Sequence, residues 1–158
     1  MDSKLFLHQM EFSRKGLFRV IADVTEEEAR VVPQGFNNSI LWNAGHIVLS
    51  VEQFLFFGTH RQAALPSAYM GLFWRGTKPS EWKTDPPSLQ DVVQLIKEQT
   101  QRVKHEFQEA LDASLPSPMD FPGMPPIRTV SELMCMTLYH EALHIGYIKA
   151  LLKSARAS

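Results

Sequence analysis

Cysteine is nearly absent from this sequence of 158 residues, which contains only Cys135. A single thiol cannot form an intramolecular disulfide, and this usage suits a reducing compartment. An excess of either charge is also lacking, because 16 Lys and Arg residues stand against 17 Asp and Glu residues, a formal net charge of −1. The composition therefore shows no excess of positive charge of the kind that binds nucleic acid or an anionic membrane. We expect neither as a partner.

Residues 1–16 lack the continuous apolar core of a signal peptide, and their charges are mixed. The most apolar window, Ile40–Gly58, is long enough to be considered as a membrane span, but it contains polar residues that are costly in hydrocarbon. These are Asn43, His46, Ser50, Glu52 and Gln53. A buried helix explains the window better. The whole chain, residues 1–158, is expected to be one globular cytoplasmic domain.

Helical periodicity, in which apolar residues recur every three or four positions, marks four segments. They are expected at about residues 3–24, 40–58, 88–111 and 129–153. Capping boxes at Ser88-x-x-Asp91 and Thr129-x-x-Glu132 begin the third and fourth, and Asn37, Asn38 and Ser39 are candidate caps for the second. No segment combines period-two alternation with hairpin turn chemistry. The pattern predicts an all-α protein, a four-helix bundle with little strand.

Two of the expected connections are too long for simple turns between helices. Residues Thr59–Pro87 are rich in aromatic residues, and residues Asp112–Arg128 are rich in proline. Long loops in compact domains are often functional lids. Aromatic side chains are large hydrophobic fillers first, so we favour the interpretation that Phe73, Trp74 and Trp82 cover one end of the bundle.

The last expected helix contains His140-Glu141-Ala142-Leu143-His144, which fits the H-E-x-x-H pattern of zinc peptidases. Residues four apart lie on one face of a helix, so His140 and His144 can converge on one ion. Two imidazoles do not complete a tight zinc site, and residues 145–158 contain no His, Asp or Glu. No strand is expected before this helix to hold a peptide by β-pairing. A peptidase is therefore disfavoured, and a third ligand must come from upstream.

His46 is the upstream histidine on the most apolar helix, where a lone histidine is more often a hydrogen-bonded core residue. At a rise of 1.5 Å per residue, helices packed side by side could bring it level with His140 and His144. Bundle interiors are where facing helices build metal sites. Cys135 is five residues before His140, so its side chain points away from the helix face that carries the two histidines. It is expected to be a small buried hydrophobic residue. The other upstream histidines, expected to be solvated, are His8, His60 and His105.

Two short motifs in these helices point to a family. The stretch WNAGH, residues 42–46, resembles a W-x-x-x-H signature, and His140, His144 and Gly146 resemble a closing H-x-x-x-H signature followed by glycine. In these motifs, in length and in its long connection between the second and third helices, the chain resembles the DinB-like (YfiT-like) superfamily. The resemblance implies a four-helix bundle of unusual handedness, often a homodimer, that binds a divalent metal. By matching positions the ligands are His46, His140 and His144.

The resemblance also implies a range of activities on small molecules. Members include transferases that use low-molecular-weight thiols such as bacillithiol, a mycothiol-dependent isomerase, and many metal-dependent hydrolases without a demonstrated substrate. Three neutral imidazoles leave a divalent ion with an open position, as in catalytic zinc sites, which suits either thiol transfer or hydrolysis by an activated water. Zinc or nickel is the expected ion, with bacillithiol or a similar thiol as the expected co-substrate. The alternative is a non-catalytic metal-binding or sensing bundle.

Glu141 is the candidate for proton transfer at such a site. It is expected to act as a general base or to hydrogen-bond a ligand imidazole, because no basic residue lies three or four positions away to pair with it. A solvated helix glutamate is an equally good interpretation. Tyr139, Tyr147 and Trp42 are candidates to line the cavity, although packing is the default explanation for all three.

Overall fold

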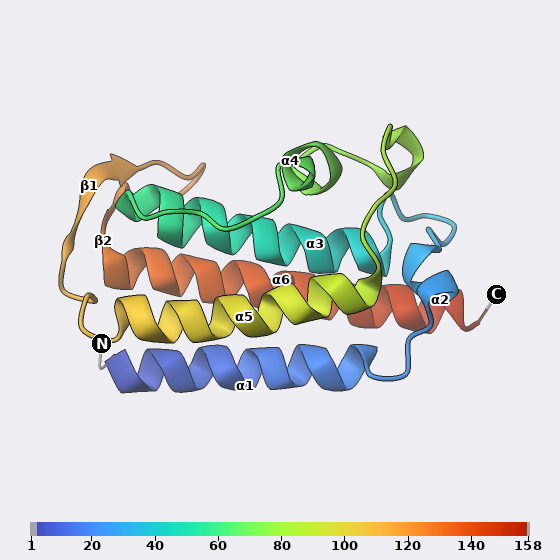
Figure 1. Cartoon of the computed structure of the whole chain (residues 1–158), viewed down its shortest axis with the longest axis horizontal. Coiled ribbons are helices and arrows are strands. Elements are labelled where there is room, and N and C mark those ends of the chain that lie inside the picture. The colour runs from blue at the N-terminus through green and yellow to red at the C-terminus, as the bar shows by residue number, and fades with distance from the viewer. Residues whose placement is uncertain (1–2, 158) are drawn as a thin grey trace.

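The computed structural model describes residues 3–157 as a mostly helical molecule. Four long helices, α1, α3, α5 and α6, lie side by side along the long axis (Figure 1). Helix α3 packs against both α5 and α6, and α1 packs against the same two helices. The elements are α1 (Ser3–Ile21), α2 (Glu26–Arg30), α3 (Ile40–Val51), α4 (Ala68–Phe73), α5 (Leu89–Phe107), β1 (Ser114–Met119), β2 (Ile127–Thr129) and α6 (Val130–Ala155). A π-helical turn (Glu52–Phe56) and a 3₁₀ turn (Phe57–Thr59) extend α3, and a second 3₁₀ turn spans Pro79–Glu81.

The long helices begin where the sequence places their caps. The Ser88 hydroxyl accepts from the Asp91 N–H at 3.1 Å, while the Asp91 carboxylate accepts from the Ser88 N–H. Both backbone N–H groups of the capping box therefore have a hydrogen-bond partner. Thr129 and Glu132 form the same reciprocal pair at the start of α6. For α3 the cap is Ser39, so Asn37 and Asn38 are not needed as caps.

Every residue of α3 is buried. The window Ile40–Thr59 has the length and mean hydropathy, 1.3, of a membrane span, but 83% of it is buried inside the protein. Its polar side chains have protein partners, since the Asn43 amide donates to Ser39 O at 2.8 Å and Glu52 pairs with Arg102 at 2.8 Å. Burial of such groups is tolerable only when they are paired in this way. Helix α3 is thus the central helix of a folded core.

A small antiparallel sheet departs from the expectation of helices alone. Strands β1 and β2 pair in the proline-rich connection that precedes α6, with Ser114 opposite Thr129, Met119 opposite Ile127, and an irregular register between. Two prolines in β1 have no N–H to donate, which limits regular pairing. Only Leu115 of β1 is buried, so the hydrophobic alternation that would have predicted a strand is missing.

The aromatic connection lies along the side of α3 rather than at one end of the helices (Figure 1). Helix α4 buries Tyr69, Leu72 and Phe73. The Trp82 indole N–H donates to Leu72 O at 2.8 Å, while Trp74 remains 42% exposed. The packing interpretation therefore holds for Phe73, but the expected place of the segment at a bundle end is wrong.

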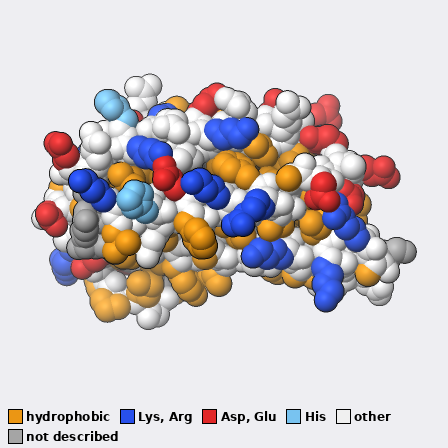
Figure 2. All heavy atoms as spheres, turned by 90° about the horizontal axis from the view of Figure 1, so that it is seen from below, with side chains coloured by type: hydrophobic (Ala, Val, Ile, Leu, Met, Phe, Trp, Pro, Cys, Tyr) orange, Lys and Arg blue, Asp and Glu red, His pale blue; other side chains and the backbone are white. Residues whose placement is uncertain are grey.

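The surface carries charges of both signs. Figure 2 views the molecule from the α1 side and shows acidic and basic side chains over this face, with hydrophobic side chains along its lower edge. Cys135 is also exposed, so its expected burial is wrong. It is three residues after Glu132 and four before Tyr139, and this spacing places all three on the exposed side of α6.

Candidate metal centre

Three histidine side chains meet between α3 and α6. His46 comes from α3, and His140 and His144 come from adjacent turns of α6, with one ligand nitrogen from each within 4.8 Å of the others. The expected convergence is confirmed. In the part of the chain that the structure describes, no carboxylate or thiol belongs to this group. The donor set is therefore three imidazoles, which suits divalent zinc, nickel, copper or iron.

The His46 ring is oriented by the backbone of α4. Its Nδ1 lies 2.7 Å from Phe73 O, and because a carbonyl oxygen can only accept, Nδ1 must carry the proton. The lone pair of Nε2 is then directed at the centre, where the Ser50 hydroxyl lies 3.4 Å away. A hydrogen bond of this kind to the far ring nitrogen is the usual means of fixing a ligand histidine.

The His144 ring is fixed in the same way by Asn43. The Asn43 amide nitrogen donates to Ser39 O at 2.8 Å, which sets the orientation of the amide and turns its oxygen toward the ring. His144 Nδ1 lies 2.8 Å from that oxygen and must therefore be the donor. Its Nε2 is left unprotonated, so α3 supplies both His46 and the group that orients His144.

The three rings are held neutral by their surroundings. Burial lowers the pKa of His140 to about 4, helped by the neighbouring His46. Burial, then repulsion from His46 and His140, lowers the pKa of His144 to about 3. Burial also lowers the pKa of His46, against the opposing hydrogen bond to Phe73 O. Metal ligation requires neutral imidazole, so the protonation state of the group fits a metal near neutral pH.

Close packing supports the geometry on the α3 side. The Trp42 indole stacks on the His46 ring with centroids 4.7 Å apart, and its N–H donates to Thr77 Oγ1 at 2.9 Å. A Cβ on Gly45 would lie 2.6 Å from the Phe73 ring, so only glycine lets α4 approach closely enough for Phe73 O to reach His46. Trp42 therefore supports the site by packing, as the default interpretation had it.

A cavity of about 240 Å³ opens beside the histidines. Its wall is mainly aromatic and apolar, and residues of the aromatic and proline-rich connections contribute to it. The lining residues are His46, Ser50, Gln53, Phe54, Trp74, Arg75, Phe121, Met136 and His140. Tyr139 and Tyr147 do not line this cavity, and they are 60% and 41% exposed. The solvated character expected for His8, His60 and His105 is confirmed, since all three are exposed.

Glu141 faces the other side of α6. Its side chain is 2% exposed, so the interpretation as a solvated glutamate is wrong. Its Oε2 lies 3.3 Å from Arg14 Nε of α1, and Oε1 has no hydrogen-bond partner. Neither oxygen bonds an imidazole, and the side chain does not line the cavity. The structure therefore places Glu141 in a buried ion pair between α6 and α1.

The ion pair belongs to a longer buried network. Arg14 also donates to Gln99 Oε1 at 2.9 Å, and Gln99 donates onward to Glu52 Oε1 at 2.8 Å. Glu52, in the π-helical turn, pairs in addition with Arg102 and accepts from the Ala64 N–H at 2.9 Å. Five segments of the chain are thereby linked, and any one of the charged groups would be costly if it were left unpaired.

Sequence reasoning missed two groups of the centre. Asn43 orients His144, and an amide in the first turns of a largely apolar helix was the available indication. The carbonyl of Phe73 orients His46, and no side-chain pattern could have identified a backbone atom 27 residues away. Both groups act through a ligand histidine rather than as ligands themselves.

The comparisons with known proteins agree with the fold and extend over these residues. The sequence pattern of the DinB superfamily matches residues 9–148, which include all three histidines. A conserved protein from Enterococcus faecalis, known from its crystal structure, shares the fold with a TM-score of 0.75 over 99% of this chain and 98% of that one, at 13% sequence identity. None of the curated proteins compared with the chain matches it. Because the family pattern covers most of its length, the chain belongs to the DinB superfamily.

Proposed function

We propose that this four-helix bundle is a divalent-metal-dependent enzyme acting on small molecules, with His46, His140 and His144 as ligands of a zinc or nickel ion. The observation that carries the proposal is the cavity of about 240 Å³ whose wall includes His46 and His140. Three protein ligands with open space beside two of them is the arrangement of catalytic rather than structural sites. When bound, the ion would lower the pKa of a water or thiol in its open position and so supply a nucleophile near neutral pH.

The residues around the cavity bind and orient the substrate. Phe54, Trp74 and Phe121 exclude water, and the Ser50 hydroxyl offers a hydrogen bond next to the histidines. No Asp or Glu lines the cavity among the described residues. Metal-dependent hydrolysis normally also uses such a group to carry the proton of the attacking water to the leaving group, whereas a thiol that binds the ion as thiolate has already lost its proton. Thiol transfer, with bacillithiol or a similar thiol as co-substrate, is therefore better supported than hydrolysis.

The competing function is a non-catalytic bundle in which the ion only fixes or senses the helix arrangement. That function predicts a coordination sphere closed by a fourth protein ligand and no space beside it. The three-histidine group faces a cavity, and no fourth ligand joins it among residues 3–157. We therefore favour the enzyme.

We also propose that the protein is a cytoplasmic homodimer. The C-terminal half of α6 carries Leu143 and Tyr147 on its exposed side, which are 54% and 41% exposed, with the small Ala142 and Gly146 beside them. Large exposed apolar residues that form a stripe often mark a protein interface. Leu143→Lys should convert a dimer to a monomer in sedimentation experiments, and a monomeric mass for the unaltered protein would contradict the proposal.

The experiment that tests the function is metal analysis of the protein as isolated, compared with His140→Ala. We expect stoichiometric divalent metal in the unaltered protein and its loss in the variant. His105→Ala is the matched control, because His105 is exposed on α5 outside the group. Loaded protein should then be assayed with electrophiles and bacillithiol, glutathione or cysteine. Metal that is absent from the unaltered protein, or retained fully by His140→Ala, would contradict the assignment.

A further inference from the structure

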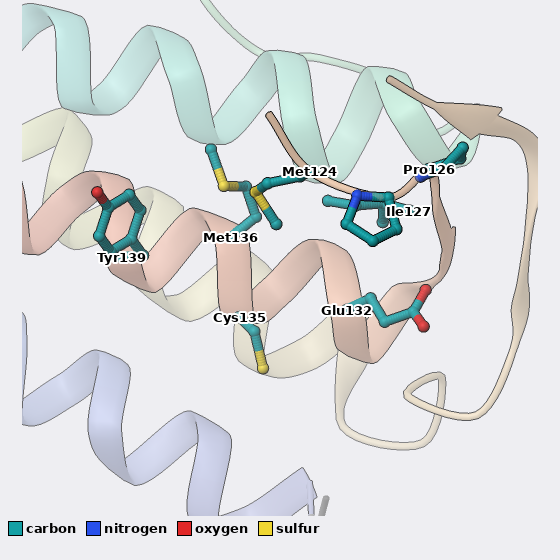
Figure 3. A pocket seen from close by; sticks show the side chains of 8 residues that line it. Met124, Pro126, Ile127, Glu132, Cys135, Met136 and Tyr139 are labelled. Carbon is teal, nitrogen blue, oxygen red and sulfur yellow. The ribbon is translucent and has the colours of Figure 1, made fainter. Parts of the chain in front are cut away.

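A second hollow, of about 520 Å³, lies on α6 close to the three-histidine cavity. Figure 3 shows its side chains, which come from α6 and from the segment that leads into β2. The lining residues are Met124, Pro125, Pro126, Ile127, Glu132, Cys135, Met136 and Tyr139. Apart from Glu132 and the Tyr139 hydroxyl, this wall is apolar. We call it the β2 hollow.

Met136 connects the β2 hollow with the three-histidine cavity, because it lines both. Phe121 of the cavity and Met124 of the hollow also belong to one short segment. Met136 is one helical turn before His140, and Glu132 is one turn further, so the two hollows together extend roughly 12 Å along α6. Because a methionine side chain is unbranched and flexible, the Met136 side chain between the two hollows can move aside.

The polar groups at the two ends differ. Arg75 lines the cavity next to the histidines and has no ion pair or hydrogen bond among the described residues. Glu132, in the β2 hollow, is hydrogen-bonded within the protein, because its carboxylate accepts from the N–H groups of Arg128 and Thr129 at 2.8 and 3.0 Å. The histidine end therefore offers a free guanidinium for an anion, while the β2 end offers apolar surface and one fixed negative charge.

We propose that the two hollows form one elongated site for a small molecule with an anionic end and an apolar tail. The anionic end binds Arg75 beside the histidines, and the tail passes Met136 into the β2 hollow. Glu132 disfavours the opposite orientation, since it would repel an anion there. This inference names the substrate class of the proposed enzyme and rests on that function for the reaction, although the binding itself is measurable without catalysis.

Cys135 provides a built-in reporter, because it is the only thiol of the chain, lines the β2 hollow and is exposed. The test measures the rate at which a disulfide reagent modifies Cys135 in the presence of dodecanoate, hexanoate or dodecylammonium. Dodecanoate should slow the reaction, and it should bind at least roughly tenfold more tightly than hexanoate, because each buried methylene contributes up to roughly fourfold in affinity. Dodecylammonium should protect far less.

Substitutions locate the binding at each end. Met124→Trp should fill the β2 hollow and remove the difference between dodecanoate and hexanoate. Met70→Trp is the matched control, since Met70 is similarly exposed, 44% against 47%, and lines neither hollow. Arg75→Gln should weaken dodecanoate roughly tenfold, and Lys83→Gln, the same charge change in the same connection, should not. Circular dichroism confirms that each variant is folded.

Several outcomes would overturn the inference. Equal protection by dodecylammonium would mean that the anionic end is not recognised, and unchanged protection in Met124→Trp would mean that the tail lies elsewhere. Protection that rises with protein concentration without any probe would assign the β2 hollow to a second copy of the chain. Metal content, measured on the same samples, separates the two proposals: protection without bound metal refutes the enzyme, whereas bound metal without protection refutes the elongated site.

Discussion

The ion pair between Glu141 and Arg14 yields a prediction that distinguishes a structural role of Glu141 from a catalytic one. Both side chains are almost fully buried, 2% exposed, and Oε2 of Glu141 lies 3.3 Å from Arg14 Nε. The guanidinium has further acceptors in Ile96 O at 3.0 Å, Thr100 Oγ1 at 2.6 Å and Gln99 Oε1 at 2.9 Å. Replacing Glu141 with glutamine removes the only anion in contact with Arg14 among the described residues, while it changes the shape of the side chain little.

The expected cost follows from these contacts. Removing one partner of a buried ion pair costs about 3–5 kcal/mol, because the other charge stays buried without compensation. Glutamine keeps an oxygen that can accept from Arg14, and the guanidinium retains its neutral acceptors, so Glu141→Gln should cost about 2–3 kcal/mol of unfolding free energy. For a chain of this length the melting temperature should fall by roughly 5–10 °C.

Urea unfolding followed by circular dichroism measures this cost, with metal content determined on the same samples. Glu109→Gln is the control, since Glu109 is exposed and should change stability by less than about 0.5 kcal/mol. The double variant Arg14→Met, Glu141→Leu should be less destabilised than the sum of its single variants, because it leaves no unpaired charge. Glu141→Gln protein that is as stable as the unaltered chain but has lost activity would refute a purely structural role.

Three further predictions concern the histidines and their support. Asn43→Leu should weaken metal binding by roughly 10–100-fold, measured by chelator competition, because His144 loses the group that orients it. Gly45→Ala should cost about 1–2 kcal/mol in urea unfolding, as its methyl meets the Phe73 ring, whereas Gly146→Ala, with open space around it, should stabilise by up to about 1 kcal/mol. Metal-free protein should lose stability as the pH falls from about 6.5 toward 4, by at most about 1.4 kcal/mol per pH unit per histidine. The reason is that the pKa of His144 in the folded protein, about 3, lies below its value in the unfolded chain, so the unfolded chain binds more protons in this range. A flat pH profile would contradict the burial of these rings.

The expected helices followed from features encoded locally, since capping boxes and apolar stripes define where each helix begins and which face it buries. The meeting of the three histidines was expected from the rise per residue, which could bring His46 level with the pair on α6, together with the family resemblance. The partner of Glu141 could not be found in this way. Arg14 is 127 positions away in the chain, and only the packing of α1 against α6 makes the two neighbours.

The missed sheet and the exposed thiol have physical causes of another kind. Strand β1 contains two prolines and buries only Leu115, so it lacks both the alternation and the regular donors from which strands are predicted. The exposure of Cys135 depends on what covers the far side of α6, which helical periodicity alone does not specify. Local patterns thus predicted the four long helices, whereas the sheet and the exposure of Cys135 required the assembled molecule.

The HEALH segment satisfies two separate requirements of one helix. Consecutive residues on a helix are turned by about 100°, so His140 and His144 share a face while Glu141 points elsewhere. The histidines face α3, where the Phe73 carbonyl orients the His46 ring and Asn43 orients the His144 ring. The glutamate faces α1, where an ion pair fixes the helix that carries the ligands. The two faces should therefore respond differently to substitution: changes at residues that face α3 should alter metal affinity, and changes at residues that face α1 should alter stability.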